Sequence, residues 1–224
     1  MSHTRRRSTA HPRTPRRLAP LLALLLLGAC APRLRPLGGA PAPAALRLPT
    51  PALPQGHRRV VFDWALEDAD MAARGDGVAR MASPDSARLD FFLRGGFGGG
   101  WAILVGDTLR TPGPDRVRDM LPPVPMLWAA LGRVALPATA DTSIAVEGDL
   151  LRADLGQPVA WRVTFRGDTL VRLERVSGGR VVEWVDRASP TRVVYRREVP
   201  RRELTLILSG PDEPTTFDPS IWQR

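Results

Sequence analysis

The stretch ARLDFFLRGGFGGGWAILV, residues 87–105, contains two apolar segments separated by a glycine-rich loop. In the first segment, Ala87–Leu93, apolar side chains recur at every second position, which is typical of a half-buried strand. The second segment, Trp101–Val105, is apolar throughout. Five glycines among residues 95–100 make a flexible connection between the two. The stretch therefore predicts an antiparallel hairpin.

The same alternation continues through most of the chain after residue 57. It is clearest in residues 60–66, 159–165 and 204–208, where every second residue is apolar. Short pairs of glycine, proline, serine and aspartate separate these segments and favour tight turns. The pattern predicts about ten antiparallel strands, and a sheet of that size usually curls or splits.

One segment in the middle of the chain follows a helical period instead. Residues 114–121 and 124–131 suit two short helices. Within the second, four apolar residues share one helical face: Val124, Leu127, Trp128 and Leu131. The opposite face is apolar too, so we expect this helix to be buried, and Gly132 stands where a helix-ending glycine is favoured. The predicted fold class is mostly β (α+β), a single curled antiparallel half-barrel of about ten strands with short helices covering its concave side.

The N-terminal region has the features of an export signal. Residues 18–29 form an apolar run of 12 residues, shorter than the about 20 that a membrane-spanning helix needs. Six arginines and no acidic residue precede this run. Cys30 follows directly, and the arrangement resembles the bacterial lipoprotein signal, in which the cysteine is acylated. The alternatives are a cleaved signal peptide with an incidental cysteine, or a misassigned start codon.

Removal of such a signal changes the charge of the protein. The chain carries a net charge of +9, with no lysine, and the six arginines within residues 1–29 account for much of it. Without them, 26 basic and 23 acidic residues leave a net charge of +3. The remaining arginines alternate with acidic and apolar residues, so no basic patch of the kind that binds nucleic acid is predicted.

The chain divides into three predicted parts. Residues 1–29 are the signal peptide, residues 30–56 the lipidated cysteine and a proline-rich tether, and residues 57–224 the half-barrel domain. Seven prolines argue against a helix or a sheet strand in the tether, which would be extended and semi-rigid. A peptidoglycan-spanning or protein-binding segment is the alternative. These prolines are Pro32, Pro36, Pro41, Pro43, Pro49, Pro51 and Pro54.

Catalytic, metal-binding and cofactor-binding patterns are not found. His57 is the one histidine after the signal, so no Ser-His-Asp or Cys-His set can be assembled. Metal-ligand spacings of histidine and cysteine are missing. The glycine-rich loop lacks the lysine and the following helix of a phosphate-binding loop. We therefore predict a protein that is not an enzyme and has no cofactor, with a hydrolase as the remaining alternative.

Phe97 is the one residue of the segment 95–100 that is not glycine. Two interpretations stand side by side. Its ring either folds back onto the core or protrudes and touches a membrane or an acyl chain, because exposed large apolar groups commonly mark contacts.

The order of these features resembles the family of periplasmic carriers and outer-membrane receptors of the lipoprotein-localisation pathway. Residues 88–104 (RLDFFLRGGFGGGWAIL) are similar to two strands of the receptor and the loop between them. Residues 121–137 (LPPVPMLWAALGRVALP) resemble its Pro-x-Pro helix, and residues 161–165 a later strand. The resemblance extends over most of residues 58–210. It departs at the proline-rich tether, where the receptor has a helix, and at Phe97, where the receptor has leucine.

The resemblance implies a half-barrel that binds acyl chains or lipoproteins in an apolar cavity and helps insert lipoproteins into the outer membrane. Phe97 and Gly98 would form the membrane-contact loop. Partners would be the membrane, through lipid on Cys30, acyl chains or lipoproteins, and a periplasmic carrier. Ala31, rather than aspartate, favours the outer membrane facing the periplasm over the inner membrane. The alternative is a non-enzymatic envelope scaffold of the same fold with a filled core.

The cavity walls are assigned from the apolar phase of each strand and of the helix. For every member of the set, an ordinary place in the core is an equally good interpretation. The predicted lining residues are Phe62, Trp64, Leu89, Phe91, Trp101, Ile103, Leu127, Trp128, Trp161 and Val163.

Overall fold

The computed structural model describes residues 32–95, 98–113, 118, 121–137, 142–187, 189–211 and 216–223. The predicted signal peptide, Cys30 and Phe97 lie outside these residues. The elements are β1 (Ala40–Pro41), β2 (His57–Asp68), β3 (Ala72–Ala82), β4 (Ser86–Leu93), β5 (Gly99–Val105), β6 (Thr108–Arg110), α3 (Val124–Ala130), β7 (Thr142–Glu147), β8 (Leu150–Leu155), β9 (Trp161–Arg166), β10 (Thr169–Ser177), β11 (Arg180–Asp186), β12 (Arg192–Arg197), β13 (Arg202–Pro211) and the 3₁₀ helix η2 (Pro219–Trp222).

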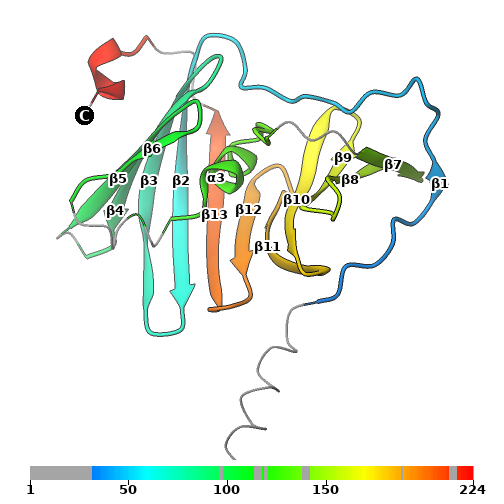
Figure 1. The fold of residues 1–224 in the computed structure, drawn as a ribbon. Helices are drawn as coiled ribbons and strands as arrows, with labels where there is room; N and C mark the ends of the chain where they lie inside the picture. Colours follow the sequence, from blue (N-terminus) through cyan, green and yellow to red (C-terminus); the bar gives the residue numbers. More distant parts are fainter. Residues whose placement is uncertain are drawn as a thin grey trace, which may run out of the picture. The chain divides into compact units, whose positions relative to one another are not determined.

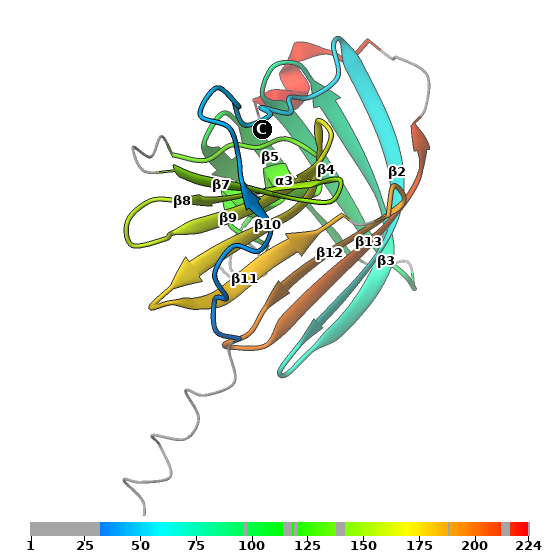
Figure 2. The ribbon, with the colours of Figure 1, turned by 90° about the vertical axis from the view of Figure 1, so that its right-hand side faces the viewer.

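All the strands belong to one antiparallel sheet (Figure 1). Its order is β1-β7-β8-β9-β10-β11-β12-β13-β2-β3-β4-β5-β6, which is two meanders joined where β13 pairs with β2. The sheet curls around α3, as the turned view shows (Figure 2). The predicted fold class is therefore confirmed, with 13 strands in the described residues where the sequence suggested about ten.

The concave face of the sheet forms the core. Because successive side chains of a strand point to opposite faces, the apolar phase of each strand lies on this face. Leu206 of β13 pairs with Trp64 of β2, and Val163 of β9 pairs with Leu173 of β10. Leu173 is fully buried and Val163 is nearly so. The burial of these side chains supplies the main driving force for the curl.

The helix α3 lies in the concave side of the sheet and connects its two halves. It packs against β10, β11 and β12, and its residues 126–130 are all buried. The indole Nε1 of Trp128 donates a 2.7 Å hydrogen bond to the carbonyl of Gly106, in the turn between β5 and β6. Arg187, just after β11, donates to the carbonyl of Ala130. The predicted buried helix is confirmed, and Gly132 follows it with a φ of 89°.

The other predicted helix, residues 114–121, falls mostly outside the described residues. Among those that the structure describes, no helix has the length and apolar character needed to cross a membrane.

The segment before β2 differs from its prediction. Residues 32–53 run along the domain, β1 pairs with β7, and Leu53 is only 3% exposed in the core. The prediction that the prolines exclude a strand here is wrong. An edge strand forms hydrogen bonds on one side only, so it tolerates proline at some positions. Here the amide of Ala42, next to Pro41, donates to the carbonyl of Ile144. The compact unit accordingly begins at Pro32 rather than at residue 57.

The bond from Trp128 to Gly106 gives a test of how α3 is held. Trp128→Phe keeps most of the packing but removes the indole donor from the half-buried carbonyl of Gly106. We expect the free energy of unfolding to fall by about 0.5–1.5 kcal/mol, measured by urea denaturation. Trp161→Phe is the control, because the half-buried Trp161 indole donates no hydrogen bond to the described residues. Equal losses for both variants would contradict the assignment.

Candidate functional site

Alternate turns of an antiparallel sheet lie at the same end. The turns β2–β3 (69–71), β10–β11 (178–179) and β12–β13 (198–201), and the loop that follows Leu93, share one end of this sheet. We call this end the rim. The turns β3–β4, β5–β6, β7–β8 and β9–β10 lie at the opposite end.

An apolar cavity of about 310 Å³ lies on the concave face beside the rim. We call it the rim cavity. It exists because the β2–β3 hairpin reaches further than β4. The last paired residue of β4, Leu93, lies opposite Gly75, whereas β2 and β3 remain paired as far as Glu67 and Ala72. The residues that line it are Trp64, Leu66, Met71, Ala73, Phe91, Leu93, Gly99, Gly100, Trp101, Leu121 and Leu204.

The rings of Trp64 and Phe91 form the inner wall of the rim cavity, and the core residue Phe62 packs against Phe91. Phe91 meets Phe62 edge to face at 5.6 Å and Trp64 edge to face at 5.9 Å, both within the preferred range for aromatic pairs. The Nε1 of Trp64 donates to the carbonyl of Asp76 at 3.0 Å, so its polar atom is satisfied by the backbone. Gly77 makes this arrangement possible, since a Cβ there would lie 2.3 Å from the Phe62 ring.

The half-barrel is filled further along, under the helix. Only about 10 Å³ of space remains between α3 and the strands that face it, among Leu127, Tyr195 and Leu206. Native interiors are close-packed in this way. The open volume is thus concentrated at the rim rather than spread along the whole concave face.

The predicted lining residues separate into three groups. Trp64, Phe91 and Trp101 border the rim cavity. Within the filled core lie Phe62, Leu89, Leu127, Trp128 and Val163, with Trp161 half-buried against them.

Trp101 and Ile103 lie in the opposite phase of β5 from its core residues, although Trp101 also borders the rim cavity beside Gly99 and Gly100. Their neighbours Ala102 and Leu104 occupy the core, and Trp101 pairs with Asp90 on the opposite face. There the guanidinium of Arg88 lies over the Trp101 ring, 5.5 Å from its centroid. The C-terminal η2 packs against β4 and β5 and covers this face, so both faces of β5 are buried. Because the strand is apolar on both faces, its sequence does not show which side chains point to the concave face.

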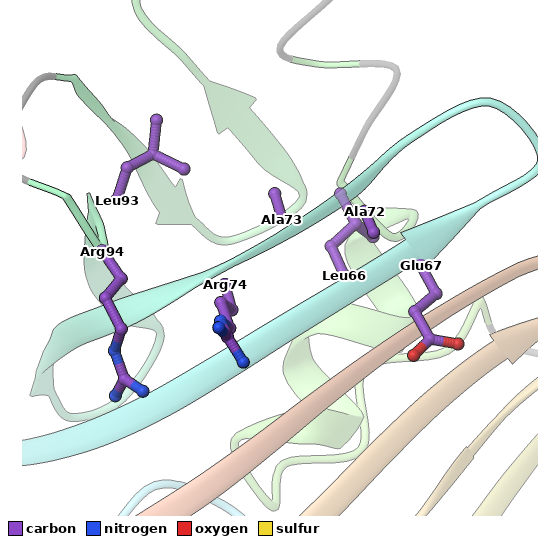
Figure 3. A pocket seen from close by; sticks show the side chains of 7 residues that line it. All are labelled: Leu66, Glu67, Ala72, Ala73, Arg74, Leu93 and Arg94. Atoms are coloured by element: carbon purple, nitrogen blue, oxygen red, sulfur yellow. The ribbon is translucent and has the colours of Figure 1, made fainter.

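A second, more open pocket of about 460 Å³ adjoins the rim cavity (Figure 3). Leu66, Ala73 and Leu93 border both spaces. The remaining residues of this charged notch are Glu67, Ala72, Arg74 and Arg94. Figure 3 shows the charged side chains projecting away from Leu93. Leu93, which borders both spaces, is 41% exposed, so apolar surface continues from the cavity to solvent.

The sequence reasoning missed a polar cluster on the concave face. Glu183 is 1% exposed, accepts a 2.8 Å hydrogen bond from the hydroxyl of Tyr195 and pairs with Arg175. The Arg202 Nε donates to Asp68 at 2.8 Å, and this hydrogen bonding lowers the pKa of the Asp68 carboxyl. A signal was present in the sequence, because Glu183 occupies the apolar phase of its strand.

The cluster is an arrangement of paired charges rather than a set of free acid and base groups. Glu183 faces Arg175 and the Tyr195 hydroxyl, and Asp68 faces Arg202. In the part of the chain that the structure describes, histidine, cysteine, aspartate and glutamate do not gather in groups of three that could hold a metal ion.

Several solved structures resemble this chain at low sequence identity, among them the following three. A LolA superfamily protein from Nitrosomonas europaea has a TM-score of 0.47 and 12% identity, over 77% of this chain and 92% of that chain. A DUF1329 family protein from Desulfovibrio piger has a TM-score of 0.43 and 8% identity, over 75% and 90%. A domain from Vibrio parahaemolyticus, named for outer membrane lipoprotein sorting, has a TM-score of 0.38 and 9% identity. The match covers 75% of this chain and 89% of that chain. No protein-family model and no curated protein matches the sequence.

Tyr195 gives a spectroscopic test of the buried cluster. Burial, followed by the charge of Glu183, raises the pKa of its hydroxyl above the ordinary value of 10.0. The stability that this shift represents is present below pH 10 and is lost as the pH rises above it. Because Tyr195 is the one tyrosine of the chain, tyrosinate absorbance reports on it alone. We expect none at pH 11 in the folded protein and titration near 10 in urea. Ionisation near 10 in both would contradict the burial.

Proposed function

We propose that this protein is a non-enzymatic lipoprotein of the bacterial envelope that binds acyl chains of lipids or lipoproteins in the rim cavity. The observation that carries the proposal is the apolar volume of about 310 Å³ between the aromatic wall and the rim. It lies at the lower limit of the roughly 300–1,000 Å³ of known ligand pockets. Such a volume would take the end of an acyl chain, with the remainder along the exposed Leu93.

Binding of this kind needs no bond-making chemistry. Each methylene moved from water into the cavity contributes about 0.8 kcal/mol. The lining is apolar, and the Trp64 indole is already bonded to the backbone. A chain without polar groups therefore enters at no cost in lost hydrogen bonds, whereas a polar ligand would lose its own hydration.

The anchor and the location belong to the same proposal. Lipid on Cys30 would hold the protein at the outer membrane facing the periplasm, where several acyl chains give stable attachment. The cargo would arrive from a periplasmic lipoprotein carrier, and the loop at Phe97 and Gly98 would touch the bilayer as the cargo enters it.

A second candidate is an envelope scaffold of the same fold with a filled core. The observation that favours it is the space of only about 10 Å³ beneath α3. In that case protein partners would bind the outer surface and the rim cavity would stay empty. The two candidates differ in one measurable property, the uptake of an acyl ligand.

Ala73→Trp tests the rim cavity. Ala73 borders the cavity, and its neighbour Ala72 is exposed on the other face of β3, so Ala72→Trp is the matched control. Loss of room for two methylenes removes about 1.6 kcal/mol, on the order of tenfold in affinity. We expect that loss for Ala73→Trp alone, measured by titration of the chain from Ala31 with a fluorescent fatty acid. Equal affinity of both variants, or no uptake by the parent protein in native mass spectrometry, would favour the scaffold.

Phe97→Glu tests the loop in cells. A charge at a membrane-contact position is costly to bring into the apolar part of a bilayer. We expect the variant to deliver lipoproteins to the outer membrane poorly, and Phe97→Leu to behave as the parent protein. The measurement is the distribution of lipoproteins between the two membranes after fractionation. Full delivery by Phe97→Glu would remove the loop from the proposal.

A further inference from the structure

We propose that residues 32–53 are a docked strap that holds the rim of the domain against the bilayer. The proposal rests on the proposed anchor at Cys30 and goes beyond it by assigning the membrane-facing surface. A free tether would let the domain turn in any direction, whereas a strap bonded to the sheet fixes which end lies next to the anchor.

The strap begins at the rim. The amide of Val181 donates to the carbonyl of Pro32 at 3.0 Å, and the amide of Leu34 donates to the carbonyl of Gly179 at 2.9 Å. These bonds hold the strap at the β10–β11 turn, which belongs to the rim. The strap then runs away from the rim, as the ribbon shows between Pro32 and β1 (Figure 1).

Further contacts hold the strap along its length. Arg162 of β9 donates to the carbonyl of Arg35 at 2.7 Å, and β1 pairs with β7. Near the end of the strap, the amide of Val134 donates to the carbonyl of Pro51 at 3.1 Å. Leu53 is buried in the core. The strap is therefore attached at its start, its middle and its end.

The attachment shortens the distance between anchor and domain. A flexible chain of 27 residues, the length predicted for the tether, would have a mean end-to-end distance of about 30 Å. With Pro32 bonded to the sheet, only Ala31 lies between it and Cys30, a span of at most about 7 Å. Covalent geometry alone then places the anchor beside the rim.

The surface of the rim suits a bilayer. Phe92, Leu93 and Val199 are exposed there, Val199 to 68%. Arg33 and Arg201 add exposed positive charge, which attracts anionic lipid headgroups. Glu67 at the end of β2, Asp70 in the β2–β3 turn and Glu198 in the β12–β13 turn are acidic exceptions.

Four of the turns at the opposite end carry an acidic residue. The turns β3–β4, β5–β6, β7–β8 and β9–β10 each contain an aspartate: Asp85, Asp107, Asp149 and Asp168. An anionic surface repels this end and attracts the rim, so charge and strap favour the same orientation. The rim cavity and its charged notch would then open next to the lipid.

The orientation can be measured on the full lipidated protein in vesicles of phosphatidylethanolamine and phosphatidylglycerol. Since an acylated Cys30 leaves no thiol, Val199→Cys and Asp107→Cys each introduce a single labelling site, one at the rim and one at the opposite end. We expect a fluorophore at residue 199 to be quenched several-fold more strongly by headgroup-labelled lipid than one at residue 107. Equal quenching, or stronger quenching at residue 107, overturns the proposal.

Two glycines allow the strap to be released with a matched control. A Cβ at Gly39, where φ is 90°, would lie 2.2 Å from the carbonyl oxygen of Val146, whereas one at Gly38 would lie 3.5 Å from the Glu147 side chain. Gly39→Val with Leu34→Pro removes the pairing with β7 and the bond to Gly179. Gly38→Val leaves both intact. We expect the double variant to lose the difference in quenching and Gly38→Val to keep it.

The outcome is separable from that of ligand binding. The double variant should still take up fluorescent fatty acid, which shows that it is folded. Ala73→Trp should lose fatty acid yet keep the difference in quenching. A double variant that binds fatty acid and retains the full difference overturns the role of the strap. Failure of the parent protein to bind fatty acid would instead count against the proposed function alone.

Discussion

The pairing of β13 with β2 is the contact on which the rest of the structure depends. It joins two meanders that are separate in the chain, and it sets Trp64 opposite Leu206 and Phe62 opposite Leu208 on the concave face. Cross-strand apolar pairs of this kind stabilise a sheet and fix its register. Without this pairing, each meander would expose one apolar face, and neither could enclose α3.

The rim cavity is a consequence of unequal strand lengths in this sheet. β2 and β3 continue towards the rim beyond the end of β4, so Ala73 lacks a paired neighbour on the side of β4. Unfilled apolar volume normally lowers stability, by an amount that grows with the size of the cavity. A larger side chain at Ala73 would fill the space, and Gly99 and Gly100 add no side chains to it. A chain that leaves this volume open in an otherwise filled half-barrel has the geometry of a binding site.

Local patterns in the sequence predicted most of the fold. Alternation gave the strands, and the apolar residues of 124–131 together with Gly132 gave the buried helix. The failures occurred where distant segments decide the outcome. At Trp101 and Ile103, the C-terminal η2 covers the second face of β5, which removes the alternation that would show direction.

The candidate site was predicted less well than the fold for the same reason. Trp64 and Phe91 were identified from their phase, but Met71, Leu121 and Leu204 reach the cavity from three different parts of the chain. Their convergence depends on the β2–β13 pairing and on the course of the chain just before α3. The docking of residues 32–53 was missed because proline content predicts only the local backbone conformation. It does not predict that the edge of β7 is available for pairing with Ala40.

The position of the cavity at the rim has an energetic meaning for transfer of acyl chains. A chain that leaves a protein through water exposes its methylenes, and ten of them cost about 8 kcal/mol. A cavity that opens where the exposed Leu93 continues the apolar surface shortens that exposure. The benefit requires the opening to face the lipid. A domain on a free tether would satisfy that condition only part of the time, whereas one bonded at Pro32 to the same end of the sheet would satisfy it continuously.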